Sequence, residues 1–234
     1  MAVNSRGGSS SKTFLGVYSN SLVLEYDKRE DLEKKVESMG LDPDLIKVRQ
    51  RTKGKNEGKD VFYYNLHDVS GMMTNVSLRD TDWGEVLEIE ITDVDEKYLL
   101  QLGEVFGRIP KDFIRRLGGI DIEKEMAFGT WGMVSKDNGK PYSGVTIYQD
   151  DEKVEYTLGR EHLPEATKKT RGKKIEWDFS EQEDFLYDVL TKFMDDNFAK
   201  SSDESNSTPD PAPKVRTPRA SKKQEEEAHD DLPF

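Results

Sequence analysis

The sequence predicts a mainly β fold with flanking helices, followed by a disordered C-terminal tail. Short segments rich in β-branched and aromatic residues, bounded by Gly, Asn or Asp, recur from Leu22 to Leu158 and are typical of strands. Apolar residues at helical spacing indicate a long helix that begins near Ser180. From Lys200 onward Ser, Pro, Asp, Lys and Glu dominate, and a segment of that composition buries too little apolar surface to fold.

We expect three parts in this chain of 234 residues. Residues 1–12 are rich in Ser and Gly, which indicates a flexible arm. Residues 13–199 show apolar periodicity throughout and have the size of one domain. Residues 200–234 are expected to form a disordered linker that ends in an acidic tip.

The first part of the domain is predicted to contain four strands and one helix. The strands are Leu22–Tyr26, Leu45–Thr52, Val61–Leu66 and Met72–Leu78, and the helix is Asp31–Met39, which ends at Gly40. The second and third strands flank a loop of Gly, Lys and Asn, so we expect them to form a β-hairpin.

Alternation is clearest in Val86–Ile91, where apolar residues alternate with Glu88 and Glu90. Because successive strand side chains point to opposite faces, we expect the apolar residues in the core and both glutamates in water. Asp95 is a candidate N-cap for a helix, and Pro110 can begin a second short helix. The first helix would bury Tyr98, Leu99, Leu102 and Phe106, and the second would span Phe113–Leu117.

Strand patterns resume before the long helix, which Ser180 and Glu183 would begin as a capping box. They cover Glu125–Val134, Gly144–Tyr148 and Val154–Leu158. Three strands, a helix and two strands are the order of a five-stranded oligonucleotide/oligosaccharide-binding (OB) barrel. We therefore expect an OB-fold-like β-barrel with extra elements at both ends. Its elements would be Leu45–Thr52, Val61–Leu66, Val86–Ile91, the helix near Tyr98, Glu125–Val134 and Gly144–Tyr148.

The charge of the chain limits how it could bind nucleic acid. The net charge is −12, and residues 200–234 contain eight acids and six bases, so the remainder has a charge of −10. A DNA site would therefore be a local basic track on an acidic body. The absence of Cys excludes disulfides and Cys-bound zinc, and suits a reducing cytosol. We find no signal peptide and no apolar run long enough to span a bilayer.

The best internal indication of function is a row of cations followed by aromatic residues. Cations at every second position of a strand share one face, and here they are Lys47, Arg49, Arg51 and Lys53. The next strand adds the rings of Phe62 and Tyr64, with Tyr63 between them. A cationic groove with rings for base stacking is the common solution for single-stranded nucleic acid. The alternative is an edge strand kept soluble by Lys and Arg, with the aromatic residues in the core.

Further candidates lie later in the domain. Trp131 lies between glycines that would allow close approach of a ligand, and Tyr148 is a second stacking candidate. Lys136 and Lys140 flank a turn, and residues 168–174 form a basic cluster that we expect in a loop. The complete predicted DNA site is Lys47, Arg49, Arg51, Lys53, Phe62, Tyr64, Trp131, Lys136, Lys140 and Tyr148.

No catalytic residue, metal site or cofactor is expected. The acidic clusters near Asp80, Asp93 and Asp150 lack the spacing of an EF-hand loop, and we find no phosphate loop or catalytic triad. A carboxylate-metal nuclease is therefore the weakest alternative function. A protein-interaction module that does not bind DNA directly is a stronger one.

The chain ends in an acidic tip with a terminal ring. The tip consists of Asp230, Asp231, Leu232, Pro233 and Phe234. A ring suits a small apolar pocket, an α-carboxylate suits an Arg, and acids suit a basic rim. The tip resembles that of bacterial single-stranded DNA-binding proteins, with Leu232 in place of the commoner Ile. This resemblance implies that the tip recruits partner proteins, whereas the alternative is a frayed tail without a partner.

Three stretches of the domain show a further resemblance. They are Leu87–Leu99 (LEIEITDVDEKYL), Tyr142–Asp151 (YSGVTIYQDD) and Ile175–Phe185 (IEWDFSEQEDF). They resemble a group of bacteriophage single-stranded DNA-binding proteins. The resemblance implies an OB barrel that coats single strands in DNA replication, recombination and repair, in the cytoplasm of an infected bacterial host. It also implies that the tail recruits replication and recombination proteins. Since no apolar run is long enough to span a bilayer, we expect no membrane contact.

Deletion of Phe234 should abolish recruitment of partner proteins while single-strand binding stays the same or becomes slightly tighter. The deletion removes the ring, and the acidic tail would otherwise compete weakly with DNA for basic residues. Pull-down of replication proteins and DNA titrations at low and high salt check both effects. Unchanged pull-down would remove the tip from this account, and lost DNA binding would place the tail in the DNA site.

Overall fold

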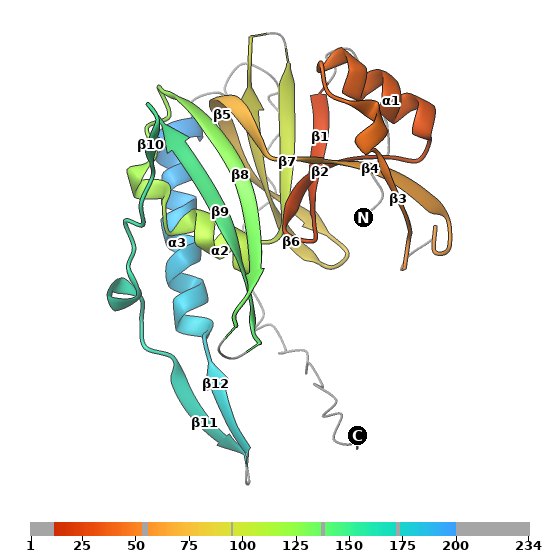
Figure 1. Cartoon of the computed structure of the whole chain (residues 1–234). Helices are drawn as coiled ribbons and strands as arrows, with labels where there is room; N and C mark the ends of the chain where they lie inside the picture. The colour runs from red at the N-terminus through yellow and green to blue at the C-terminus, as the bar shows by residue number, and fades with distance from the viewer. Residues whose placement is uncertain (1–11, 53–55, 95, 137–138, 172–173, 200–234) are drawn as a thin grey trace, which may run out of the picture. The chain divides into compact units, whose positions relative to one another are not determined.

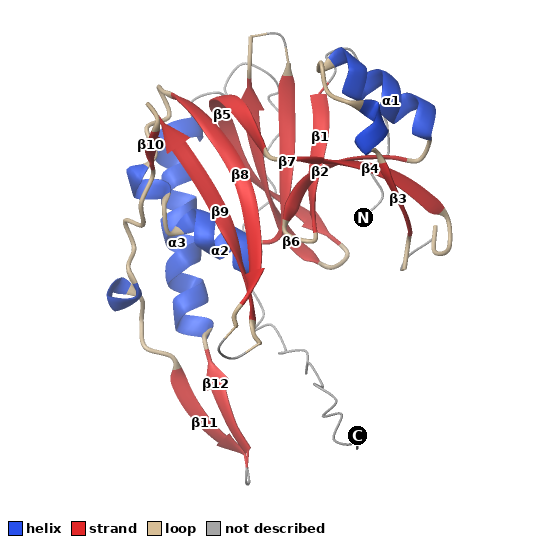
Figure 2. Cartoon of the chain, viewed as in Figure 1, coloured by secondary structure: helices blue, strands red, loops and turns tan. Residues whose placement is uncertain are grey.

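The computed structural model describes residues 12–52, 56–94, 96–136, 139–171 and 174–199, and these form a mainly β structure with three α-helices (Figures 1 and 2). One sheet contains β1 (Lys12–Tyr18), β2 (Ser21–Tyr26), β3 (Lys47–Gln50), β4 (Asp60–Leu66), β5 (Asp68–Thr81), β6 (Gly84–Thr92), β7 (Lys97–Glu104), β8 (Glu125–Val134), β9 (Pro141–Gln149) and β10 (Glu152–Lys153). A separate hairpin contains β11 (Thr167–Arg171) and β12 (Lys174–Asp178). The helices are α1 (Arg29–Ser38), α2 (Arg108–Ile114) and α3 (Ser180–Phe198).

The large sheet is mixed, and its strand order is β10-β9-β8-β5-β6-β7-β1-β2-β4-β3. β1 and β7 run parallel, and the other neighbouring strands run antiparallel. The expected hairpin of β3 and β4 is present, with Lys47 opposite Tyr63. Among the described strands β10 and β3 are the sheet edges, so the closed barrel that we expected is not found.

The core lies between the sheet and its helices. Figures 1 and 2 show α2 and α3 on the same side of β8 and β9. Phe113 of α2 packs on Phe128 of β8 with ring centroids 6.0 Å apart, and both side chains are fully buried. Leu186 and Leu190 form the buried face of α3, and Leu32 is a buried residue of α1. The apolar stripes of the helices therefore cover the sheet as their spacing predicts.

The segment that we expected as a helix near Tyr98 is strand β7, so this prediction was wrong. Tyr98, Leu100 and Leu102 are buried, whereas Leu99 and Gln101 are half-buried, which is a strand period. β7 lies between β6 and β1, so it forms hydrogen bonds on both edges. The apolar spacing of this segment fits either period, and the pairing with two neighbouring strands decides.

Glu88 is also not in water, since only 7% of the residue is exposed. Arg79 Nε lies 2.5 Å from its Oε1, and Gln101 Nε2 donates to the same oxygen at 3.0 Å. Arg79 lies on β5 and Gln101 on β7, the two neighbours of β6, so both side chains can hydrogen-bond the buried carboxylate and offset the cost of its burial.

Three boundaries also differ from expectation. α2 begins before Pro110 and ends at Ile114, so it lies earlier than the expected helix. Only Glu152–Lys153 forms a strand near the expected 154–158 segment. The N-cap of α3 is Phe179 and not Ser180, and it has no side-chain cap bond, so the expected capping box is absent. Glu183 pairs instead with Lys111, whose Nζ lies 2.9 Å from Oε1.

Gly71→Ala should lower the free energy of unfolding by roughly 3 kcal/mol, because strain and a clash add. Gly71 has a φ of +144°, and a Cβ there would lie 2.6 Å from the carbonyl oxygen of Thr92. Gly103 provides a matched control, since it has a φ of +102° but no atom within 4 Å of its added Cβ. Urea unfolding should show a smaller loss for Gly103→Ala, and equal losses would contradict the clash.

Candidate nucleic-acid interface

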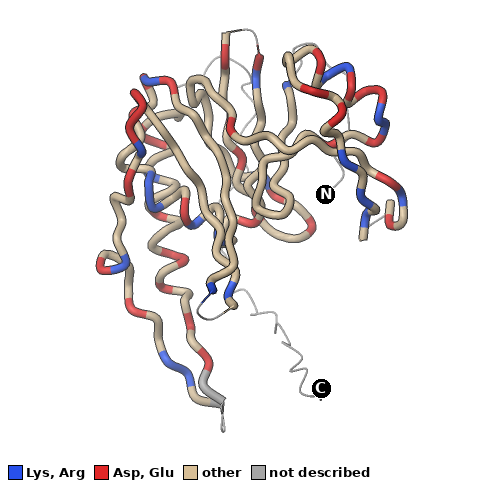
Figure 3. The backbone as a smooth tube through the Cα atoms, viewed as in Figure 1, with Lys and Arg blue, Asp and Glu red and all other residues tan. Residues whose placement is uncertain are grey.

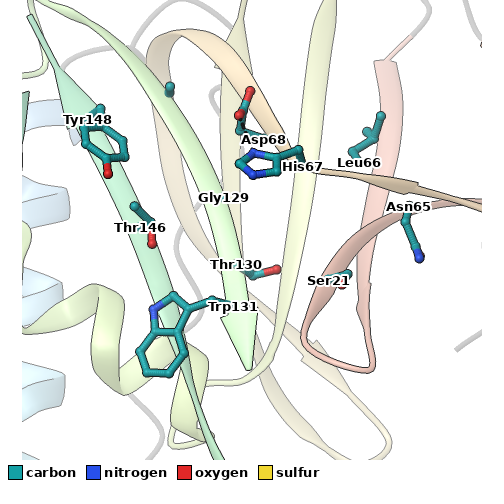
Figure 4. Close-up of a pocket in the computed structure, with 11 residues that line it drawn as sticks. Ser21, Asn65, Leu66, His67, Asp68, Gly129, Thr130, Trp131, Thr146 and Tyr148 are labelled. Atoms are coloured by element: carbon teal, nitrogen blue, oxygen red, sulfur yellow. Dashed lines mark hydrogen bonds and ion pairs between the residues drawn. The ribbon is translucent and has the colours of Figure 1, made fainter. Parts of the chain in front are cut away.

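A cleft opens where the chain changes strand partners. β4 ends at Leu66 and pairs with β2, whereas β5 begins at Asp68 and pairs with β6 and β8. The register of β5 with β8 ends at Asp68 opposite Gly129, so β8 continues beyond this point without β5. A pocket of about 570 Å³ lies here. Its lining residues are Ser21, Asn65, Leu66, His67, Asp68, Ala127, Gly129, Thr130, Trp131, Thr146 and Tyr148 (Figure 4).

One wall of the cleft is a single face of β8 and β9. The register places on this face Ala127, Gly129 and Trp131 of β8 with Tyr148, Thr146 and Gly144 of β9. On the opposite face, Phe128 and Ile147 are fully buried. Figure 4 shows Trp131, Thr146 and Tyr148 along this wall. The wall thus presents two aromatic rings that the core does not use.

Trp131 is held in position through the backbone of β9. Its Nε1 donates to the carbonyl oxygen of Val145 at 3.2 Å, and the Val145 N–H donates to Asp112 Oδ2 at 2.8 Å. A Cβ at Gly144 would lie 2.5 Å from Asp112 Oδ2 and 3.0 Å from Trp131 Cζ2, so the absence of a side chain makes room for both the carboxylate and the indole. The Tyr156 hydroxyl donates to Asp112 Oδ1 at 2.5 Å. Burial, followed by this hydrogen bond, raises the pKa of Tyr156, so the donated proton is retained.

The opposite wall leads to a second pair of rings. Ser21 lies directly opposite Tyr18 in the β1–β2 register, and Tyr63 lies two residues before Asn65 on the same face of β4. The rings of Tyr18 and Tyr63 meet edge to face with centroids 5.4 Å apart, and Arg49 Cζ lies 4.1 Å from the centroid of the Tyr18 ring. Trp131 and Tyr148 line the cleft, whereas Tyr18 and Tyr63 lie beside the lining residues Ser21 and Asn65. We call these four rings the aromatic track: Tyr18, Tyr63, Trp131 and Tyr148.

Two arginines of the predicted cation row are ion-paired within the protein. Arg49 Nη2 lies 2.5 Å from Glu25, and Arg51 Nη2 lies 3.2 Å from Glu25 and 2.8 Å from Asp27. The side chain of Arg51 is only 10% exposed. Acids therefore compensate both guanidinium charges, and Lys47 is the exposed cation of the row among the described residues. Lys53 lies outside the described residues.

Phe62 and Tyr64 do not lie with these cations. Because Lys47 is opposite Tyr63, the side chains of Phe62 and Tyr64 point to the other face of β4. Tyr64 is 7% exposed in the core, and Phe62 packs against the core. The register of the hairpin identifies Tyr63 as the ring that shares a face with Lys47, but the sequence alone does not show which residues pair. Tyr18 had no such signal in the sequence.

Further cations lie near the wall that β8 and β9 form. Lys136 and Lys140 are exposed at the turn between β8 and β9, and Arg108 Nη1 donates to the first carbonyl of β9 at 2.6 Å. Lys153 lies opposite Tyr148 in the β9–β10 register and is exposed. Sequence reasoning missed Arg108 and Lys153, because it could not place α2 and β10 beside β9. The basic cluster expected in a loop instead lies in the hairpin of β11 and β12.

The tip residues 230–234 lie outside the described residues. In the described part of the chain, no three His, Asp or Glu side chains are grouped to hold a metal ion. Nor does any helix there have the length and apolarity to cross a bilayer. Comparison with protein-family models, curated proteins and solved structures found no match.

Arg51→Ala should reduce the free energy of unfolding by about 2 kcal/mol, because it leaves the half-buried Glu25 with one cation fewer. Lys47→Ala is the matched control, since it removes an exposed cation from the same row and should leave stability nearly unchanged. Thermal or urea unfolding distinguishes the two, and equal stability of both variants would mean that the Glu25 pairs contribute nothing.

Proposed function

We propose that this protein is a non-catalytic single-stranded DNA-binding protein. The observation that supports this most is the aromatic track beside the cleft, which offers rings to unpaired bases. In a duplex the bases are already stacked on one another, so such rings favour single strands. Exposed cations near the track are suited to phosphates, and they are Lys47, Lys136, Lys140 and Lys153.

The order of elements supports a relation to the OB fold. β5, β6, β7, α2, β8 and β9 follow one another as three strands, a helix and two strands, and β8 returns to pair with β5. β1 pairs with β7 and extends the sheet toward β2, β4 and β3. We propose an OB-like centre that β1 to β4 enlarge, with the nucleic acid along its cleft.

The role in the cell follows from the sequence resemblance and belongs to the same proposal. The protein would coat single strands during phage DNA replication, recombination and repair in the bacterial cytoplasm. Its tip at Asp230–Phe234 would recruit replication and recombination proteins. The net charge of −12 favours one alternative, a protein-interaction module in which the aromatic track binds a protein partner.

Trp131→Ala and Tyr148→Ala should each weaken binding to oligo-dT by roughly tenfold, because each ring stacks on one base. Trp83→Ala is the matched control: this residue is 83% exposed in the turn between β5 and β6 and does not line the cleft. Fluorescence titration should show quenching in the parent protein and a negative slope of log affinity against log salt. Equal affinity for duplex and single strand, or no binding by the parent protein, would refute the proposed function.

A further inference from the structure

The hairpin of β11 and β12 forms a ladder with no third strand in the described structure. Figure 1 shows it extending away from the ten-stranded sheet. It is anchored at its base, where Gln182 Nε2 of α3 donates to the carbonyl of Pro164 at 2.6 Å and Asp178 accepts the N–H of Ser180 at 3.1 Å. A two-stranded hairpin alone is marginally stable in water, so an extended one in contact with solvent calls for a role.

The hairpin is basic although the protein is acidic. Residues 167–178 contain five bases and two acids, a charge of +3 in a chain of −12. Figure 3 shows a stretch of basic residues within β11. Such a local reversal of charge favours an anionic partner.

The register gives the two faces of the hairpin different characters. Lys168 lies directly opposite Trp177, so the ammonium and the indole share a face, and both residues are exposed, Trp177 by 57%. Lys169 lies on the other face, where it pairs with Asp178. The hydrogen bonds from Lys169 and from the Ser180 N–H lower the pKa of Asp178 to about 2, so this carboxylate stays charged at neutral pH.

We propose that the β11–β12 hairpin is a second contact site for single-stranded DNA, in which Trp177 stacks on a base and Lys168 meets the adjoining phosphate. The proposal rests on the proposed function, because it assumes that the aromatic track holds the same strand. Charge selects a polyanion, and an exposed ring beside a cation selects one with unpaired bases. Neither feature needs sequence-specific contacts.

The two sites together predict a dependence on strand length. A short oligonucleotide fills the aromatic track alone. A longer one that is bound there reaches the hairpin at a high effective concentration, so the second contact adds affinity without a second encounter. Loss of the hairpin contact should therefore weaken binding of long strands only.

The test compares the parent protein with the double variant Lys168→Ala/Trp177→Ala on oligo-dT of about 8 and about 30 nucleotides. The matched control is Lys192→Ala/Trp83→Ala, which removes the same charge and ring from exposed positions on α3 and the β5–β6 turn. We expect the hairpin variant to lose about tenfold affinity for the long strand and none for the short one. Its salt slope on the long strand should fall by about 1. The control should match the parent protein on both strands.

A second measurement follows the hairpin directly. The chain contains three Trp residues, so Trp83→Phe/Trp131→Phe leaves Trp177 as the only one. Its emission should be quenched by the long strand and not by the short one. If the parent protein binds both strands but the hairpin variant binds the long strand equally well, this inference is wrong and the proposed function stands. If the parent protein binds neither strand, both are wrong, and quenching of Trp177 by a protein partner instead would assign the hairpin to protein binding.

Discussion

The parallel ladder between β1 and β7 is the constraint on which the rest of the sheet depends. Lys12–Leu15 pair with Lys97–Leu100, and without this ladder the described strands would form two antiparallel sheets, β10-β9-β8-β5-β6-β7 and β1-β2-β4-β3. Side chains from both sides reinforce it, since Glu96 accepts hydrogen bonds from Thr13 and Lys35. Parallel strands need a long connection, and here it runs through both halves of the sheet.

The two halves are joined a second time at His67, where β4 passes into β5. Between these attachments each half contributes one wall of the cleft and one pair of rings. Acidic residues of each half also position its rings. Asp112 binds the N–H of Val145, the residue whose carbonyl accepts from Trp131, and Glu25 pairs with the arginine that lies over Tyr18. Partly buried pairs such as Arg51 and Glu25 cost desolvation, so their use here is better explained by positioning than by stability alone.

The parts of the fold that were predictable depend on local pattern. The alternation in β6 was enough to identify a strand, and the glycines around Trp131 pointed to a residue that lines the cleft. β7 was mistaken for a helix because its apolar spacing fits both periods, and only pairing with β6 and β1 decides. Tyr64 was assigned to the DNA site because the sequences of β3 and β4 do not show which of their residues pair. A shift of one residue in this register exchanges the two faces of the strand. Arg51 and Glu25 are 26 residues apart in the sequence, so no local pattern predicts that they pair.

The central claim is that one DNA strand lies along both walls of the cleft, and photo-cross-linking tests it most directly. Oligo-dT that contains 5-iododeoxyuridine at successive positions would be bound, irradiated and mapped by mass spectrometry of the cross-linked peptides. The account predicts cross-links at Trp131 and Tyr148 from one end of the strand and at Tyr18 and Tyr63 from the other. Cross-links confined to one wall would contradict a continuous track, and cross-links only to residues outside the cleft would contradict the site itself.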